Sequence, residues 1–443
     1  MSTKINMSKY TSNKDSGVEW LSKIPSHWYS KPFYTIGNVV SEIYNQHKEL
    51  LSVYLDRGVI KFSDVAEKRT NVTSEDLSKY QSVEPGNLVL NNQQAWRGSV
   101  GVSRYSGIVS PAYIVLKLSN EVNSYFANYL FRDSTMVSHY LICSKGVGTI
   151  QRNLYWPQLK RVNVCFPPLP EQIAIAHYLD EKTTLIDKAI VIKQKQIALL
   201  KERRQIIIQQ VVTRGLDPNV KMKDSGVEWI GEIPEGWEVK RLKTLLQEGR
   251  DGIRIGPFGS SIKSEILKPV GFKIYGQEHV IADDFYIGEK YIDDNDFKRL
   301  SNYELFAGDI VITMMGTTGK CKVVPDKIER GIMDSHLIRV RTKISKANPE
   351  FVSFLINDSK YIFYQIKLRS KGSIMEGLNS SIVKSLHLLL PPLNEQRSIL
   401  LYVEQTNLKF AMAISLKEKE IEKLKEYKAT LINSAVTGKI KVS

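Results

Sequence analysis

The sequence is poor in cysteine and contains no long apolar run. Its three cysteines, Cys143, Cys165 and Cys321, form no close pair, which argues against a disulfide framework and against a CxxC metal site. No apolar stretch reaches the roughly 18 residues that a membrane helix needs, and residues 1–14 are too polar for a signal peptide. These absences predict a cytoplasmic protein.

Complete catalytic signatures are also missing. Residues 314–320 resemble a phosphate loop, but Met314 stands where the first glycine belongs and Cys321 where a Ser or Thr would ligate Mg²⁺. The Pro-Pro pairs at 167–168 and 391–392 lack the Asn or Asp of a methyltransferase motif, and helix entry explains them better. The seven histidines are scattered without an HExxH pattern. The sequence therefore indicates a chain with neither a catalytic centre nor a metal site.

What the sequence does have is length and positive charge. Its 443 residues predict two or three domains, and 42% hydrophobic residues suffice to bury a core. The formal net charge of +15 predicts a polyanionic partner, with nucleic acid before an anionic membrane surface. A basic surface without a specific partner is the simpler alternative.

Proline and glycine are absent between Pro170 and Gly215, which predicts one long helix or two stacked ones. A heptad seam runs through this stretch and through a second one that ends near Val436. Basic residues interrupt the seam at matching places, Lys193 and Arg204 in the first copy and Lys417 and Lys428 in the second. The apolar seam residues are Ile186, Ile190, Ile197, Leu200, Ile207, Phe410, Ile414, Ile421, Leu424 and Leu431.

Other elements recur too, so the chain is predicted to be an internal duplication. Residues 15–20 and 224–229 both read Asp-Ser-Gly-Val-Glu-Trp, and Ile-Pro followed by a tryptophan comes after each copy. This element is interpreted as a packing clasp rather than a binding surface. The predicted parts are a first domain at 1–170, a long helix at 171–214, a linker at 215–223, a second domain at 224–394, a long helix at 395–437 and a tail at 438–443.

The domains themselves are predicted to be mixed. Short apolar runs such as 51–55, 87–90, 112–116, 310–312 and 337–340 indicate strands, and single helices are expected near 122–140 and 349–368. The first long helix would span about 64 Å at ~1.5 Å per residue, whereas the linker reaches at most about 30 Å. The expected fold is therefore α+β, with two mixed domains separated by an antiparallel helical pair in a pseudo-two-fold repeat.

Polar and basic loops in matching places of both halves are the candidate DNA-binding sites. Asn, Gln and Arg present paired hydrogen-bonding groups to base edges, and glycine lets the backbone approach phosphate. Solvated loops are the alternative for each one taken alone. The candidate residues are Asn91, Asn92, Gln93, Gln94, Trp96, Arg97, Lys145, Gln151, Arg152, Asn153, Arg254, Ser260, Ser261, Lys263, Thr317, Thr318, Lys320 and Lys371.

The Pro-Pro-Leu-x-Glu-Gln openings at 167–172 and 391–396, the matched helices and the duplicated 15–20 element together resemble the specificity subunit of type I restriction-modification systems. Residues 91–101 with 107–113, 144–153 and 255–263 are similar to target-recognition domains of that family. The resemblance covers essentially the whole chain.

The resemblance implies two target-recognition domains, each reading half of a bipartite, asymmetric DNA site, with the helices as a spacer. It also implies two methyltransferase subunits docked on the helices and a motor-nuclease subunit in the complex. S-adenosylmethionine, ATP and Mg²⁺ would belong to those partners, so this chain would bind no cofactor. A protein-binding scaffold and a self-contained nuclease or methyltransferase remain the alternatives.

Overall fold

The computed structural model describes residues 8–18, 21, 23–55, 57–64, 76–147, 151–370 and 377–442. The candidate Lys371 lies outside these residues, as does Trp20 of the first repeated element. The chain divides into two compact units, one formed by residues 1–195 with 417–443 and the other by residues 196–416. We call them the first and second units and describe each by itself.

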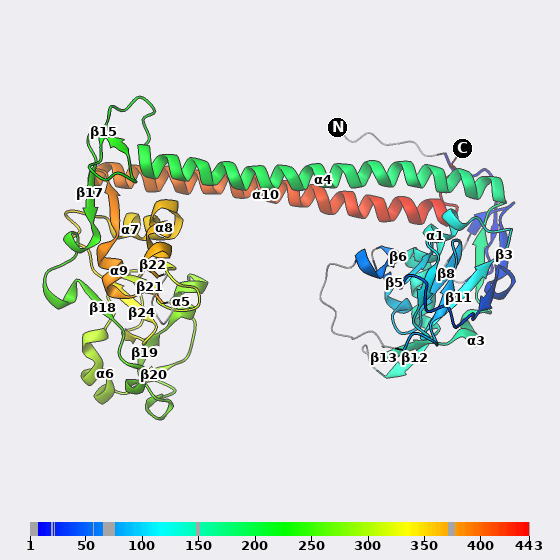
Figure 1. The fold of residues 1–443 in the computed structure, drawn as a ribbon, viewed down its shortest axis with the longest axis horizontal. Coiled ribbons are helices and arrows are strands. Elements are labelled where there is room, and N and C mark those ends of the chain that lie inside the picture. The colour runs from blue at the N-terminus through cyan, green and yellow to red at the C-terminus, as the bar shows by residue number, and fades with distance from the viewer. Residues whose placement is uncertain are drawn as a thin grey trace. The chain divides into compact units, whose positions relative to one another are not determined.

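The first unit is built around a four-stranded antiparallel sheet in the order β4-β11-β8-β9. Its two central strands, β8 and β11, are labelled in Figure 1. Leu88, Leu90 and Leu116 face the main core, whereas Val89 and Val115 belong to a second apolar cluster. This alternation is why two cores form on one sheet. Its strands are β1 (Asn13–Asp15), β2 (Lys23–Pro25), β3 (Tyr29–Pro32), β4 (Gly37–Val40), β5 (Leu51–Tyr54), β6 (Gly58–Lys61), β7 (Gln81–Val83), β8 (Asn87–Asn91), β9 (Val100–Val102), β10 (Gly107–Val109), β11 (Tyr113–Leu118), β12 (Ser144–Val147), β13 (Gln151–Leu154) and β14 (Asn163–Phe166). Its shorter helices are α1 (Ser124–Arg132), α2 (Ser134–Ile142) and α3 (Trp156–Leu159).

The second unit repeats this sheet as β18-β24-β21-β22, with the strands in the corresponding order. The same turn precedes the third strand of each sheet. Asn87 Oδ1 accepts a hydrogen bond from Glu84 N at 2.9 Å, and Asp309 Oδ2 accepts one from Phe306 N at 2.8 Å. Its strands are β15 (Met222–Asp224), β16 (Glu232–Pro234), β17 (Glu238–Arg241), β18 (Ile253–Ile255), β19 (Phe272–Tyr275), β20 (Tyr291–Ile292), β21 (Ile310–Thr313), β22 (Cys321–Val323), β23 (Gly331–Met333), β24 (Leu337–Val340) and β25 (His387–Leu390). Its shorter helices are α5 (Gln277–Ala282), α6 (Asp294–Leu300), α7 (Pro349–Asp358), α8 (Lys360–Ser370) and α9 (Ser380–Ser385).

The two helices expected near 122–140 and 349–368 are each broken into a pair. Asp133 has extended backbone (ψ 148°) between α1 and α2, where its side chain accepts a hydrogen bond from Thr135 N. Ser359 has extended backbone (ψ 126°) between α7 and α8. Each break is also held by a long helix, which a local pattern cannot reveal. Asn433 Nδ2 donates to Asp133 Oδ1 at 3.0 Å, and Gln209 Nε2 donates to Asp358 O at 2.7 Å.

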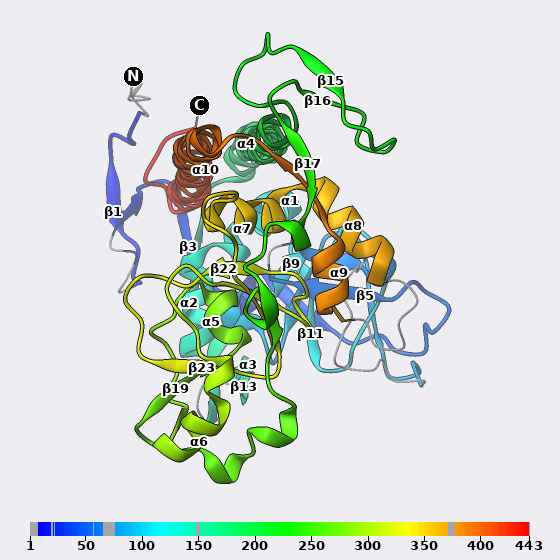
Figure 2. The ribbon, with the colours of Figure 1, turned by 90° about the vertical axis from the view of Figure 1, so that its left-hand side faces the viewer.

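Each long helix is one continuous element, which settles the choice between one helix and two. They are α4 (Leu169–Arg214) and α10 (Leu393–Val436), and they lie side by side in both views (Figures 1 and 2). In the first unit, Lys193 pairs with Glu420 at 2.7 Å and Asp187 with Lys428 at 2.7 Å, so the helices run antiparallel there. In the second unit, Arg204 Nε donates to Asn407 Oδ1 at 2.8 Å.

The predicted seam positions turn away from solvent. All of them are buried or half-buried, namely Ile186, Ile190, Ile197, Leu200, Ile207, Phe410, Ile414, Ile421, Leu424 and Leu431. Three of the four basic interruptions form polar contacts across the pair: Lys193 and Lys428 contact carboxylates, and Arg204 contacts an amide. Lys417 instead pairs with Glu420 on its own helix at 3.1 Å. The fold is therefore α+β, with two β-rich domains, packed long helices and an internal repeat.

The repeated sequence element forms a matching junction in each unit. Trp28 is fully buried, and its Nε1 donates to Glu171 Oε1 at 3.1 Å at the start of α4. In the second unit, Trp237 Nε1 donates to Glu395 Oε2 at 3.0 Å at the start of α10. The clasp interpretation fits these two tryptophans. It does not extend to Trp229, which lies between β15 and β16, is 53% exposed, and meets the His387 ring edge-on with ring centroids 6.1 Å apart.

Each junction also receives the end of a long helix. Gly438 has φ +73°, and an added Cβ would lie 2.5 Å from Pro25 Cδ and 3.3 Å from the Trp28 ring. Gly215, just after α4, has φ +76°, and its added Cβ would lie 3.4 Å from the Trp237 ring. One tryptophan thus contacts a helix start and a helix end in each unit. Within the described residues, we find no helix whose length and apolar character would let it cross a membrane.

Candidate nucleic-acid interface

In the first unit, two candidate stretches far apart in the sequence meet. Asn91 ends β8 and residues 92–97 follow it, whereas the β12–β13 hairpin carries Lys145, Arg152 and Asn153. Leu154 N donates to Asn92 O at 2.9 Å, which fixes the hairpin against the loop. The guanidinium carbons of Arg97 and Arg152 lie 4.8 Å and 5.9 Å from the centroid of the Trp96 ring. These groups gather beside the end of β8 and form a polar, cationic surface, which we call the edge of the first unit.

The other candidates of this edge differ in exposure. Gln93, Arg97, Lys145 and Asn153 are exposed, whereas the remaining described side chains are half-buried, namely Asn91, Asn92, Gln94, Trp96 and Arg152. Asn91 Oδ1 accepts a bond from Gln93 N at 3.1 Å, so Asn91 serves the turn itself. Gln151 pairs with Val147 in the hairpin register.

Lys145 belongs to a separate contact on the hairpin. Its Nζ lies 3.7 Å from the centroid of the Tyr155 ring, a cation–π distance. Because Lys145 is exposed, its ammonium group keeps access to a ligand.

In the second unit, the candidates fall into two groups. Ser260, Ser261 and Lys263 lie in or just after a 3₁₀ turn, and Thr317 and Thr318 are exposed in the loop between β21 and β22. Lys320 is half-buried and donates to Ile281 O at 3.4 Å. Arg254 is apart from these loops, on β18, where its guanidinium lies 5.8 Å from the Tyr303 ring.

The loops of this unit converge on residues 334–336, which the sequence interpretation did not select. Gly256 abuts this segment so closely that an added Cβ would lie 1.7 Å from Asp334 O. From the other side, Met314 N donates to His336 O at 3.0 Å. Burial raises the pKa of Asp334, and His336 N donates to its carboxylate at 2.8 Å, which opposes that shift. The signal was available in the sequence, because residues 334–336 follow β23 as residues 110–112 follow β10 in the repeat.

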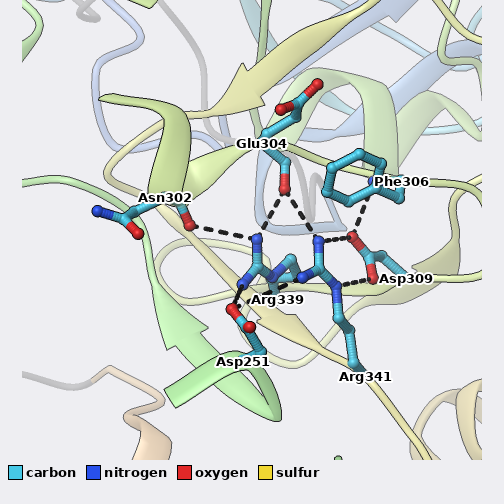
Figure 3. Close-up of polar contacts among 7 residues, drawn as sticks. All are labelled: Asp251, Asn302, Glu304, Phe306, Asp309, Arg339 and Arg341. Atoms are coloured by element: carbon cyan, nitrogen blue, oxygen red, sulfur yellow. Dashed lines mark hydrogen bonds and ion pairs between the residues drawn. The ribbon is translucent and has the colours of Figure 1, made fainter. Parts of the chain in front are cut away.

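Arg254 lies near Arg339, which is buried, and Arg341, which is half-buried. These two arginines hold the sheet to the chain segment before β21 (Figure 3). Arg341 contacts both carboxylate oxygens of Asp309, at 2.6 Å and 3.1 Å. Arg339 is 1% exposed and donates from Nη1 to Glu304 O at 2.7 Å. Burial, and then the charge of Arg341, lowers the pKa of Arg339 to about 10, so it stays cationic at neutral pH. The pair is thus a structural network under the surface.

No cluster of three or more His, Cys, Asp or Glu side chains that could hold a metal is present in the described part of the chain. All three cysteines are buried, and burial raises the pKa of the Cys321 thiol to about 12. A thiol with that pKa is not a nucleophile at neutral pH.

Comparison of the sequence with known protein families identifies the family of this chain. The family model for the type I restriction modification DNA specificity domain matches residues 31–202 and 234–426. The chain belongs to this family. The resemblance inferred from the sequence is therefore confirmed, and the chain is a DNA specificity subunit of a type I restriction-modification system. Such a subunit is non-catalytic, as the missing signatures predicted.

Relatives of the specificity subunit are distant in sequence. The MjaVIII specificity subunit of Methanocaldococcus jannaschii is 25% identical over 381 residues, which cover 82% of this chain and 83% of the relative. The EcoKI specificity subunit of Escherichia coli K12 is 20% identical over 414 residues, or 86% of this chain and 82% of the relative.

Solved structures share the fold. The crystal structure of the HsdS subunit from Thermoanaerobacter tengcongensis gives a TM-score of 0.56 at 15% identity, covering 94% of this chain and 98% of that one. A chain from a structural study of complex assembly and conformational transition of the type I R-M system gives 0.66 at 14% identity, covering 93% and 98%.

Proposed function

We propose that each unit of this specificity subunit reads one half of a bipartite DNA site in the cytoplasm. The observation that carries the proposal is the convergence of polar loops near the strand ends of the main sheet in each unit, from stretches far apart in the sequence. The net charge of +15 supports DNA as the ligand, since phosphate neutralisation contributes much of the affinity.

The two half-sites should differ in sequence. The units share a sheet topology but carry unlike loops, with Asn, Gln, Trp and Arg after β8 and Met, Gly and Thr after β21. Different donor and acceptor sets on the same scaffold recognise different base pairs. The proposed site is therefore asymmetric.

We further propose that α4 and α10 set the unread gap and dock two methyltransferase subunits, with a motor-nuclease subunit joining the assembly. On α4, a heptad-spaced row of large apolar side chains is exposed outside the seam: Leu185 at 53%, Ile192 at 55%, Leu199 at 63% and Ile206 at 47%. Such a row is typical of a helix awaiting a partner helix. S-adenosylmethionine, ATP and Mg²⁺ would be bound by those partners.

Single-molecule methylation sequencing tests the proposal directly. DNA would come from cells that express this chain with and without its neighbouring methyltransferase subunit. Methyladenine in a split, asymmetric motif is expected only when both proteins are present. If both are made and soluble but no motif appears, the recognition proposal fails and a scaffold role gains support.

A further inference from the structure

The edge of the first unit contains a more specific feature than general basic charge, namely the fixed ring of Trp96. Trp96 lies in a 3₁₀ turn, residues Ala95–Arg97, that closes on Gly98 at φ +102°. Its Nε1 donates to Gln93 O at 2.9 Å, so the indole is bonded to its own loop and not only packed. The ring is therefore held in a defined orientation.

Two arginines from different elements form cation–π contacts with this ring. Arg97 is the next residue in the turn, and Arg152 comes from β13, with guanidinium carbons 4.8 Å and 5.9 Å from the ring centroid. A cation–π contact with an aromatic face restrains the guanidinium group and so reduces the rotamer freedom lost on binding. Within the described residues, Arg97 forms no ion pair with a carboxylate, so an acid does not compete for its donors.

Resting on the proposed function, we infer that Arg97 and Arg152 read guanine in the first unit's half-site, and that Trp96 is the positioning residue for both. A fixed guanidinium fork matches the O6 and N7 acceptors of guanine in the major groove. Arg97 and Arg152 are far apart in the sequence, but both contact the Trp96 ring. They must therefore contact the same base pair or adjacent base pairs.

Lys145, on the same hairpin as Arg152, differs chemically from the two arginines. Its ammonium group over Tyr155 is a point charge without a fork, which suits phosphate rather than a base edge. The inference therefore assigns base reading and phosphate contact to different residues of one edge, and their variants should behave differently.

The test is methylation sequencing of cells that express the methyltransferase subunit with wild-type chain, Arg97→Lys, Arg152→Lys, Trp96→Leu or Trp96→Phe. Each lysine variant should reduce discrimination for guanine by about 10- to 100-fold, the value of one bidentate contact. The affected positions should be identical or adjacent, within one half of the motif. Trp96→Leu should relax the positions affected by both lysine variants, whereas Trp96→Phe should retain most of the preference.

Lys145→Met is the matched control. It should lower methylation at all sites in parallel and leave the motif unchanged. The inference is overturned if the arginine variants keep the wild-type motif, if their effects map to different halves, or if the affected half has no G·C pair. A wild-type chain that yields no bipartite motif would refute the proposed function instead, so the two failures are distinguishable. Thermal unfolding of each variant identifies loss caused by misfolding, and the two conservative lysine replacements keep the test decisive.

Discussion

Gly256 shows how closely one residue can control the recognition loops of the second unit. Its Cα faces the Asp334 carbonyl with no room for a side chain, since an added Cβ would lie 1.7 Å from that oxygen. Asp334 in turn belongs to the segment on which the other loops converge. Backbone proximity, rather than a positive φ, is why glycine is needed there.

Substituting Gly256→Ala is expected to destabilise the second unit by about 1–3 kcal/mol, because the backbone of 334–336 must move. Urea-induced unfolding followed by hydrogen exchange of peptides from the second unit measures the change. Gly236→Ala is the control, since an added Cβ there meets nothing within 4 Å. Equal effects of the two substitutions would contradict the packing argument.

His139 gives the first unit a predictable response to acid. Burial lowers its pKa from 6.5 to about 4 in the folded chain. Between these values the unfolded chain binds a proton that the folded chain does not, so stability falls as the pH drops below 6.5 and is independent of this group above it.

His139→Leu should therefore make the free energy of unfolding less steep with pH between about 4 and 6.5, by up to about 1.4 kcal/mol per pH unit. Thermal unfolding across this range, compared with His177→Leu at an exposed position of α4, tests the expectation. An unchanged slope in the His139 variant would show that burial does not lower the pKa of the His139 imidazole.

At the scale of elements, the recurring Gln of the helix openings connects each long helix to its domain. Gln172 accepts a bond from Asn123 N at 2.8 Å and donates to Pro167 O at 2.8 Å. Gln396 does the same with Asn348 N at 2.9 Å and Pro391 O at 2.8 Å. Because Asn123 and Asn348 are the N-caps of α1 and α7, one amide ties a long helix to a cap in each unit.

Gln396→Leu should destabilise the second unit by about 2–4 kcal/mol, since it leaves the half-buried N–H of Asn348 and the buried C=O of Pro391 without this partner. The exposed neighbour Arg397→Gln is the control and should change stability by less than about 0.5 kcal/mol. Hydrogen exchange in the first turns of α7 and α10 under increasing urea measures both. A loss no larger than that of the control would rule out the connecting role of Gln396.

For the whole molecule, the decisive property is the continuity of α4 and α10, each of which contributes residues to both units. A heptad inserted after Leu200 and a matching one after Phe410 would keep the seam in phase. The added length is about 10 Å per helix at ~1.5 Å per residue, or about three base pairs of duplex.

The motif methylated by the double-insertion chain should keep both half-sites and show a longer unread gap. Inserting the heptad in α4 alone should abolish methylation, because the two seams can no longer align. An unchanged gap in the double insertion, measured by the same methylation sequencing, would sink the spacer hypothesis.

The sequence by itself determined the repeat, the long helices and the main strands. These depend on local regularities: no proline or glycine between Pro170 and Gly215, a heptad seam, and apolar runs such as 310–312. The chemistry of each is complete within a short window, so no tertiary contact is needed to infer it.

Only the tertiary structure decided the helix breaks at Asp133 and Ser359, the junctions around Trp28 and Trp237, and the loops gathered on Asp334–His336 and Trp96. Each requires partners far apart in the chain, such as Asn433 for Asp133, Glu395 for Trp237 and Arg152 for Trp96. A hydrogen bond or a cation–π contact between such distant residues produces no periodic pattern in the sequence, since only the folded chain brings the two residues together.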